Sequence, residues 1–475
     1  MTNVPGRSRG LVLFGLIMGL FLSAIEMTVV STAMPKAAVE LGGTDLYSWI
    51  FGAYILLVTI TGPLWGRLSD MYGRRLIYLI GVAVFLTGSM LSGAAQDMLQ
   101  LVIFRVVQGV GGGALLVLTF TIVGEIYQLR ERSRVQGYLS SVWAIASIVG
   151  PPAGGFIADK ISWRWVFYIN IPFGILALVM VAKWLTNQKR SSNGGLDLPG
   201  AFFFTLSTSL LMILLTEYSD IGGLTEFALL VVSAVAMIVF FRIEASAKSP
   251  LIPLGLLRDR VLSIALVGNL LFGVAFFGMI SYVPILLQWL LGLPASDSGL
   301  LLTPSILGWT VAALIASRLL TRIPLKPIVL TSVVFMSAGL VIIAFFHGTS
   351  AVAIGGLLVG AGMGSVVTPL LIVVQTMVNP RELGVATALL SFMRTLGGSI
   401  GVMLMWVPIK AALDTAGLGT VTVLTEAQIS ILSGGFQYAF LIGLAAAVVC
   451  FPIYLMLPRL NLSEWDQARS TSTPD

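Results

Sequence analysis

The sequence contains few charged residues and almost no cysteine. Asp, Glu, Lys and Arg make up 10% of its 475 residues, whereas soluble domains carry about 25%. Hydrophobic residues make up 57% of the chain. So few charges cannot cover several water-soluble domains, and we therefore expect most of the chain to lie in lipid. The single cysteine, Cys450, excludes a disulfide scaffold, and the high apolar content excludes a disordered chain.

Sequence motifs for enzymatic chemistry are also missing. The chain has no P-loop, no zinc-ligand cluster and no nucleophile elbow. ATP-driven transport and hydrolysis therefore have no support. We predict a protein that is not an enzyme and that has no cofactor and no bound metal.

Long apolar runs recur from one end of the chain to the other. Each can cross roughly 30 Å of hydrocarbon at about 1.5 Å per residue. Helices are expected, because unpaired backbone is too costly in lipid and the period-2 alternation of a membrane barrel is absent. The fourteen runs cover approximately residues 11–34, 47–65, 76–95, 99–122, 135–158, 165–184, 199–217, 225–241, 261–291, 299–319, 327–346, 351–374, 385–407 and 436–457.

Lysine and arginine are concentrated in alternate loops. Short basic loops stay on the cytoplasmic side of a membrane, so this asymmetry predicts that both termini are cytoplasmic, as an even number of spans requires. The net charge of +6 is spread over many short segments, which argues against a nucleic-acid partner. We expect the first run to be kept as an anchor and not cleaved as a signal peptide.

The two halves of the chain resemble each other at an offset of 251 residues. Arg67 maps onto Arg318, and Arg130-Glu131 onto Arg381-Glu382. This offset predicts two six-helix bundles in parallel pseudo-repeat, with an inserted pair of helices between them. The predicted parts are an N-terminal bundle (1–184), the inserted pair with its linkers (185–260), a C-terminal bundle (261–457) and a cytoplasmic tail (458–475).

The turn between the second and third runs reads Gly66-Arg67-Leu68-Ser69-Asp70-Met71-Tyr72-Gly73-Arg74-Arg75. It resembles the signature loop of the major facilitator superfamily, which is glycine, three residues, aspartate, two residues, glycine and two basic residues. We expect Asp70 to dock on the helix start at Asn379-Pro380-Arg381 and to latch a cytoplasmic gate. A basic turn without a gating role remains the alternative. The gate residues are predicted to be Gly66, Asp70, Gly73, Arg74, Arg75, Glu131 and Asn379.

Glu26 is the only acid well inside any predicted span. Arg105, in the fourth span, lies at a similar depth of roughly 9–12 Å at about 1.5 Å per residue, so the two can pair. We predict that Glu26 and Arg105 serve proton coupling. Ala24–Pro35 resembles the helix-1 motif of the fourteen-helix drug:proton antiporters, which usually place aspartate where this chain has Glu26. A structural clasp for Arg105 and a structural carboxyl for Glu26 remain the alternatives.

The fifth run contains a second family motif, at residues 146–155. This stretch resembles the motif that distinguishes exporters from importers in the superfamily, and it places Gly150, Pro151, Gly154 and Gly155 on one helix. The prolines kink the helix and the glycines permit close packing. Residues 162–174 resemble the fourteen-helix branch, and their aromatic side chains also fit an interfacial belt.

Several polar residues in the C-terminal half are candidates for a substrate cavity shared with Glu26. Arg394 lies near mid-depth in its span, where an unpaired charge is costly, and a structural pair is the alternative. The other predicted cavity residues are Asn269, Ser281, Tyr282 and Gln288, although polar residues also bond across helices in ordinary packing.

The family resemblance implies a proton-coupled secondary active exporter of hydrophobic or cationic drug-like compounds that works by alternating access. The expected partners are a small amphiphilic substrate, protons and membrane lipid, and a monomer is sufficient. The expected location is the cytoplasmic membrane of a bacterial cell. Two rival functions stay open at this point, namely an exporter or flippase of lipid-like amphiphiles and a non-transporting membrane receptor or scaffold.

Overall fold

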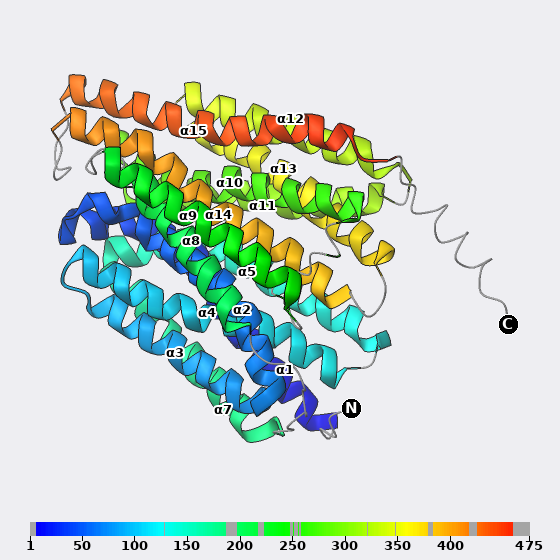
Figure 1. The fold of residues 1–475 in the computed structure, drawn as a ribbon. Coiled ribbons are helices and arrows are strands. Elements are labelled where there is room, and N and C mark those ends of the chain that lie inside the picture. The colour runs from blue at the N-terminus through cyan, green and yellow to red at the C-terminus, as the bar shows by residue number, and fades with distance from the viewer. Residues whose placement is uncertain are drawn as a thin grey trace. The chain divides into compact units, whose positions relative to one another are not determined.

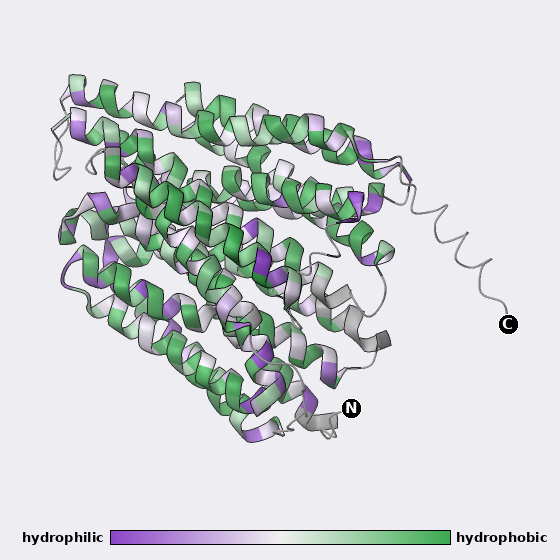
Figure 2. Cartoon of the chain, viewed as in Figure 1, coloured by the Kyte–Doolittle hydropathy of each residue, from purple (hydrophilic) through white to green (hydrophobic). Residues whose placement is uncertain are grey.

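A computed structural model of the chain describes residues 6–127, 129–186, 197–216, 223–247, 250, 255, 258–320, 322–346, 348–378, 383–417 and 425–458. Within these ranges the regular structure is helical and contains no strand, as the sequence predicts. Figure 1 shows the helices with their labels. Figure 2 shows hydrophobic residues along most of each helix and hydrophilic residues mainly near helix ends.

The helices follow one another with short connections. Those of the first half are α1 (Gly6–Leu41), η1 (Thr44–Leu46), α2 (Tyr47–Tyr72), α3 (Arg74–Ala94), α4 (Met98–Ile126), α5 (Leu129–Lys160), α6 (Trp165–Tyr168), α7 (Asn170–Trp184), α8 (Leu198–Thr216) and α9 (Gly223–Ser246). Those of the second half are α10 (Arg260–Ile285), the π-helix η3 (Leu286–Leu290), α11 (Ala295–Leu319), α12 (Leu325–Phe345), α13 (Thr349–Met377), α14 (Leu383–Thr415) and α15 (Glu426–Leu455).

The chain divides into two compact units. Unit 1 comprises Met1–Ile252, Leu287–Leu300 and Gly417–Thr425, and unit 2 comprises Pro253–Leu286, Leu301–Ala416 and Glu426–Asp475. The first turn of α11 therefore packs within unit 1, although it follows α10 in the sequence.

Twelve helices in the described ranges are long and apolar enough to cross a membrane. They correspond to twelve of the fourteen predicted runs. The other two runs, 135–158 and 199–217, lie in α5 and α8. α5 begins with several charged residues and has Pro151 and Pro152 inside it. The described apolar stretch of α8, Leu198–Leu211, is shorter than the twelve spans.

Individual helix contacts in the two units are equivalent at the offset of 251 residues. In unit 1, α1 packs on α5 and α7, and α3 packs on α4; in unit 2, α10 packs on α14 and α15, and α12 packs on α13. A Cβ atom at Gly109 would lie 2.7 Å from the Tyr54 carbonyl oxygen, and one at Gly360 would lie 1.7 Å from that of Ser305. Two further glycine pairs meet equivalent residues at the same offset: Gly113 and Gly364 meet Val58 and Trp309, and Gly111 and Gly362 meet Phe85 and Met336.

Replacement of Gly111 tests these close contacts. A Cβ atom there would lie 2.2 Å from the backbone nitrogen of Phe85, so Gly111→Ala should cost about 1–3 kcal/mol of stability through overpacking. Gly124→Ala, in the same helix, meets nothing within 4 Å and should gain up to about 1 kcal/mol from helix propensity. The thermal unfolding of the detergent-purified variants measures the difference. Equal melting temperatures would contradict the packing.

Candidate functional site

Glu26 and Arg105 form a buried ion pair inside unit 1, between α1 and α4. The Arg105 Nη1 atom donates to Glu26 Oε1 and also to Gln108 Oε1, the latter at 2.7 Å. Arg105 Nε donates to the Ile50 carbonyl oxygen at 3.1 Å, and the guanidinium carbon lies 4.1 Å from the centre of the Tyr54 ring. Arg105 is thus held by an acid, an amide, a carbonyl and an aromatic face.

Asn170, at the first residue of α7, holds the second oxygen of the same carboxyl group. Its Nδ2 atom donates to Glu26 Oε2 at 2.7 Å and to Ser89 Oγ at 2.9 Å. Ser89 Oγ in turn donates to the Phe167 carbonyl oxygen at 2.8 Å. Asn170 Oδ1 and Gln108 Nε2 are buried and have no hydrogen-bond partner among the described residues. The sequence did not single out Asn170, although it lies within the stretch that resembles the fourteen-helix branch.

The side chain of Glu26 is completely enclosed. Its exposed fraction is 0%, and that of Arg105 is 1%. Arg105 and Asn170 engage both carboxyl oxygens of Glu26, and its place in a substrate cavity stays a prediction.

The predicted antiporter motif packs directly on the helix that carries Glu26. A Cβ atom at Gly150 would lie 2.0 Å from Thr28 Oγ1, and one at Gly154 would lie 2.4 Å from the Val29 carbonyl oxygen. The hydroxyl group of Thr32 donates to the Pro151 carbonyl oxygen at 3.3 Å. The position of α1 is thus set by the glycines of α5. Gly155 faces the first turn of α11, where a Cβ atom would lie 2.1 Å from the Ala295 carbonyl oxygen.

The predicted gate loop closes on itself in unit 1. Arg74, the first residue of α3, forms ion pairs with Asp70, near the end of α2, and with Glu125 on α4. Arg74 Nη1 also donates to the Gly66 carbonyl oxygen at 3.2 Å, and Gly73 adopts the positive φ of 99° that the tight turn requires. Docking of Asp70 on Asn379 stays a prediction, since Asn379 lies outside the described residues. Arg75 is partly buried at the start of α3, whereas Glu131 lies in α5 and its side chain is not described.

The predicted cavity residues of α10 are mostly engaged in packing. Asn269 Nδ2 donates to the Ala265 carbonyl oxygen of its own helix at 2.8 Å. The Tyr282 ring stacks on that of Trp406 at 5.8 Å between centres, and Ser281 is buried beside it. These contacts favour a structural role for Asn269 and Tyr282. Gln288, in the segment that belongs to unit 1, donates to the Thr32 carbonyl oxygen at 2.9 Å.

Asp159, at the end of α5, forms a polar contact that the sequence did not reveal. Its carboxylate accepts hydrogen bonds from the backbone N–H groups of Ala295 and Ser296 at 3.3 and 2.7 Å, and it pairs with Lys36 at 2.5 Å. Asp159 therefore caps the start of α11 from another helix. Burial raises the pKa of Asp159, but the hydrogen bonds from Lys36 and Ser296 outweigh it, so its pKa lies below the usual 3.8.

The lowered pKa of Asp159 determines how the stability contributed by this contact depends on pH. Asp159 stabilises the fold at pH values above its ordinary pKa, and the stabilisation is lost as pH falls through the lower value of the folded state. We expect Asp159→Asn to cost about 1–3 kcal/mol at neutral pH. Most of the loss comes from the helix-start hydrogen bonds, because the Lys36 side chain is 42% exposed and solvent screens its ion pair. Thermal unfolding measured from pH 7 downwards should show the two proteins converging in strong acid. A difference that is constant over this range would contradict the assignment.

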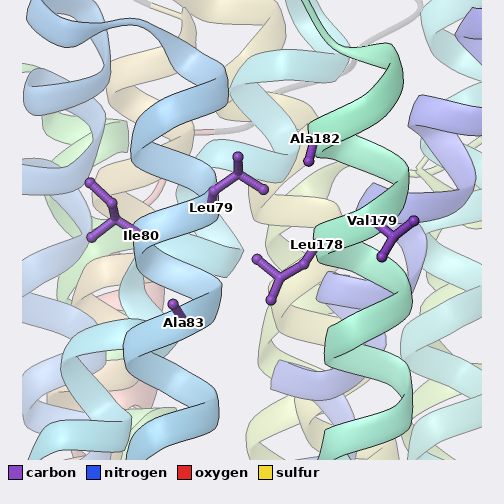
Figure 3. A pocket seen from close by; sticks show the side chains of 6 residues that line it. All are labelled: Leu79, Ile80, Ala83, Leu178, Val179 and Ala182. Carbon is purple, nitrogen blue, oxygen red and sulfur yellow. The ribbon is translucent and has the colours of Figure 1, made fainter.

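An apolar groove lies between α3 and α7 of unit 1 (Figure 3). It is an open surface groove with a volume of about 440 Å³, and it is lined by Leu79, Ile80, Ala83, Leu178, Val179 and Ala182. None of these side chains carries a polar atom, so the groove suits contact with hydrocarbon and cannot exchange a proton. The part of the chain that the structure describes also contains no group of three His, Cys, Asp or Glu side chains placed to hold a metal ion.

Comparison with known proteins accounts for the fold and the motifs together. The family model described as Major Facilitator Superfamily matches residues 16–402. The chain belongs to the major facilitator superfamily. It is therefore a multi-pass membrane transporter and not an enzyme, and the resemblance noted at the loop of residues 66–75 is confirmed over residues 16–402.

Individual relatives in this superfamily include several bacterial proteins. The chain is 33% identical to the multidrug transporter protein MdtP of Bacillus subtilis, over 84% of this chain and 74% of that protein. It is 33% identical to multidrug resistance protein 3 of the same organism, over 84% and 80%. It is 29% identical to the multidrug efflux pump SdrM of Staphylococcus aureus, over 82% and 87%.

Solved structures show the same fold. A bacterial homologue of the human lysosomal transporter Spinster superimposes with a TM-score of 0.66 at 14% identity, over 99% of this chain and 100% of that one. The nucleoside transporter NupG gives a TM-score of 0.64 at 12% identity, over 94% and 99%.

Proposed function

We propose that this superfamily member exports hydrophobic, drug-like compounds and is driven by the proton gradient through Glu26. The observation that carries the proposal is the buried Glu26 carboxylate, held by Arg105 on one oxygen and by Asn170 on the other. An acid inside a spanning helix is costly, and such residues commonly serve proton transfer in transporters. The names of the relatives MdtP, SdrM and multidrug resistance protein 3 support drug-like substrates.

The polar cluster offers a distinct arrangement for each protonation state of Glu26. The ionised form accepts hydrogen bonds from Arg105 and Asn170, as in this structure. A protonated Glu26 no longer neutralises Arg105 and has an O–H group to donate. Reversal of the Asn170 amide would present Oδ1, a buried acceptor without a described partner, to that group.

Enclosure of Glu26 couples proton exchange to helix movement. Water cannot reach a side chain whose exposed fraction is 0%, so α1 must shift from its partners before the proton is exchanged. The contacts of Gly150 and Gly154 with Thr28 and Val29 resist that shift. Release of the proton and rearrangement of α1 on α5 would therefore occur together, as alternating access requires.

The proposed topology has fourteen crossings, with α5 and α8 added to the twelve spans found by length and composition. We also propose the division into an N-terminal bundle (1–184), an inserted pair (185–260), a C-terminal bundle (261–457) and a tail (458–475). The basic loops support cytoplasmic termini. A bacterial cell membrane and a monomer fit the bacterial relatives and the internal repeat.

Proton movement in proteoliposomes tests the proposed function. Addition of hydrophobic test compounds to proteoliposomes with the wild-type protein should cause a proton flux that a pH-sensitive dye reports. Glu26→Gln should reduce this flux by at least about 100-fold. Glu26→Asp keeps a carboxyl group and should retain coupled flux. Glu226→Gln, at the start of α9 and outside the cluster, is the matched control. An unaltered flux in Glu26→Gln would refute the role of Glu26, and no flux in the wild type would favour a receptor or scaffold.

A further inference from the structure

Arg394 is an isolated charge in the interior of unit 2. It lies in α14, and the helices packed against α14 are α10, α13 and α15. α13 contains no charged residue, α10 has only Arg260 at its first position, and α15 has only Glu426 at its first position. Asp414, the acid of α14 itself, follows Arg394 by twenty residues, or about 30 Å along a helix. Glu382, which precedes α14, lies outside the described residues.

The guanidinium of Arg394 has no partner in the described part of the chain. Its Nε atom is buried and makes no hydrogen bond, and none of the ion pairs of the described residues includes it. An unsatisfied buried donor is expensive, and a charged one within a bilayer more so. The structural pair considered from the sequence is therefore absent from the described residues.

Arg105 in unit 1, unlike Arg394, has both a counter-ion and hydrogen-bond acceptors. Arg105 is neutralised by Glu26 and is further held by Gln108 and the Ile50 carbonyl oxygen. The charges of Glu26 and Arg105 cancel. The positive charge of Arg394 is the one that remains when these three side chains are taken together.

The backbone beneath Arg394 is firmly held. A Cβ atom at Gly273 of α10 would lie 2.2 Å from the Arg394 carbonyl oxygen, and one at Gly397 would lie 1.9 Å from that of Leu270. α10 and α14 therefore meet backbone to backbone at this level. A side chain that projects from such a rigid segment is placed in advance of binding.

We propose that Arg394 binds the oxyanion of the exported compound, and that the preferred substrates are apolar molecules with one carboxylate or phosphate group. The planar guanidinium presents five N–H donors in a fork that matches two oxyanion oxygens. A bound oxyanion supplies the counter-charge that unit 2 lacks, whereas a purely cationic compound meets net repulsion. This inference rests on the proposed export function and defines its substrate class.

A matched pair of probes tests the inference. The first is a fluorescent hydrophobic carboxylic acid, and the second is its methyl ester, which has the same body without the charge. The wild-type protein in proteoliposomes should export the acid faster than the ester. Arg394→Met should lower the acid-to-ester export ratio by about 10- to 100-fold, which is the effect of losing charged hydrogen bonds. Arg394→Lys should give an intermediate ratio, because it keeps the charge and loses the fork.

A control variant, a lipid probe and a stability measurement complete the experiment. Lys410→Met removes another cation from α14, near its far end, and should leave the ratio unchanged. A fluorescent anionic phospholipid distinguishes a phosphate headgroup from a free carboxylate, and preferential transfer of either one over an uncharged analogue supports the proposal. If Arg394→Met does not fold, thermal stabilisation of the wild type by the acid but not by the ester gives the same answer.

The inference and the export function fail in different ways. A wild-type protein that exports the ester or a quaternary ammonium compound at least as well as the acid overturns the inference alone. An unchanged ratio in Arg394→Met does the same. A wild-type protein that exports none of the probes and moves no protons overturns the proposed function itself.

Discussion

Arg105→Met should lower the free energy of unfolding by about 3–5 kcal/mol, because it leaves the Glu26 carboxylate buried without its cation. The loss should also abolish coupled transport, since Arg105 holds one oxygen of the Glu26 carboxyl group. Thermal or denaturant unfolding of the purified protein measures the first effect, and the proteoliposome assay measures the second.

The double variant Glu26→Gln/Arg105→Met separates charge pairing from packing. It buries no unpaired charge, so it should recover much of the stability that the single Arg105 variant loses, while transport stays absent. Arg164→Met is the control, because its pair with Glu40 has exposed fractions of 29% and 52% and should contribute less than about 1 kcal/mol. Additive losses in the double variant would show that the pair is not energetically coupled.

The Glu26–Arg105 pair was predictable from the sequence because the depth of a residue in the membrane follows from its position along its span. A helix rises about 1.5 Å per residue, so position within a span sets depth. The rarity of charges inside spans then leaves few possible partners. The same reasoning found the repeat, whose glycine contacts recur at a fixed offset.

Depth does not specify which faces of two helices meet, and this is where sequence reasoning failed. Asn170 begins α7 after the predicted single span breaks at Ile169, so its depth and direction were undetermined. Asp159 finds its partners only because the first turn of α11 packs within unit 1. Asp70 pairs with Arg74 across the turn at Gly73, a contact that the sequence analysis did not name, and its docking on Asn379 stays a prediction.

The sequence places Arg394 near the middle of its span, but it does not show that the buried Nε atom of Arg394 lacks a hydrogen-bond partner. Asp414 and Lys410 share the helix with it, and only three-dimensional spacing shows how far from Arg394 these charges lie. Composition therefore identified the expensive residues, whereas the structure distinguished the paired charge from the unpaired one.

Asn170→Asp should shift the pH dependence of transport to higher pH by more than about one unit. The variant places a second carboxyl group where the amide now lies 2.7 Å from Glu26 Oε2. Two carboxylates at this distance cannot both ionise, so the pair holds one proton more tightly. Proteoliposome flux measured at a series of pH values gives the midpoint. Asn170→Ala, which adds no acid, should transport more slowly with its midpoint nearly unchanged, and equal midpoints in Asn170→Asp and the wild type would show that proton exchange does not occur at Glu26.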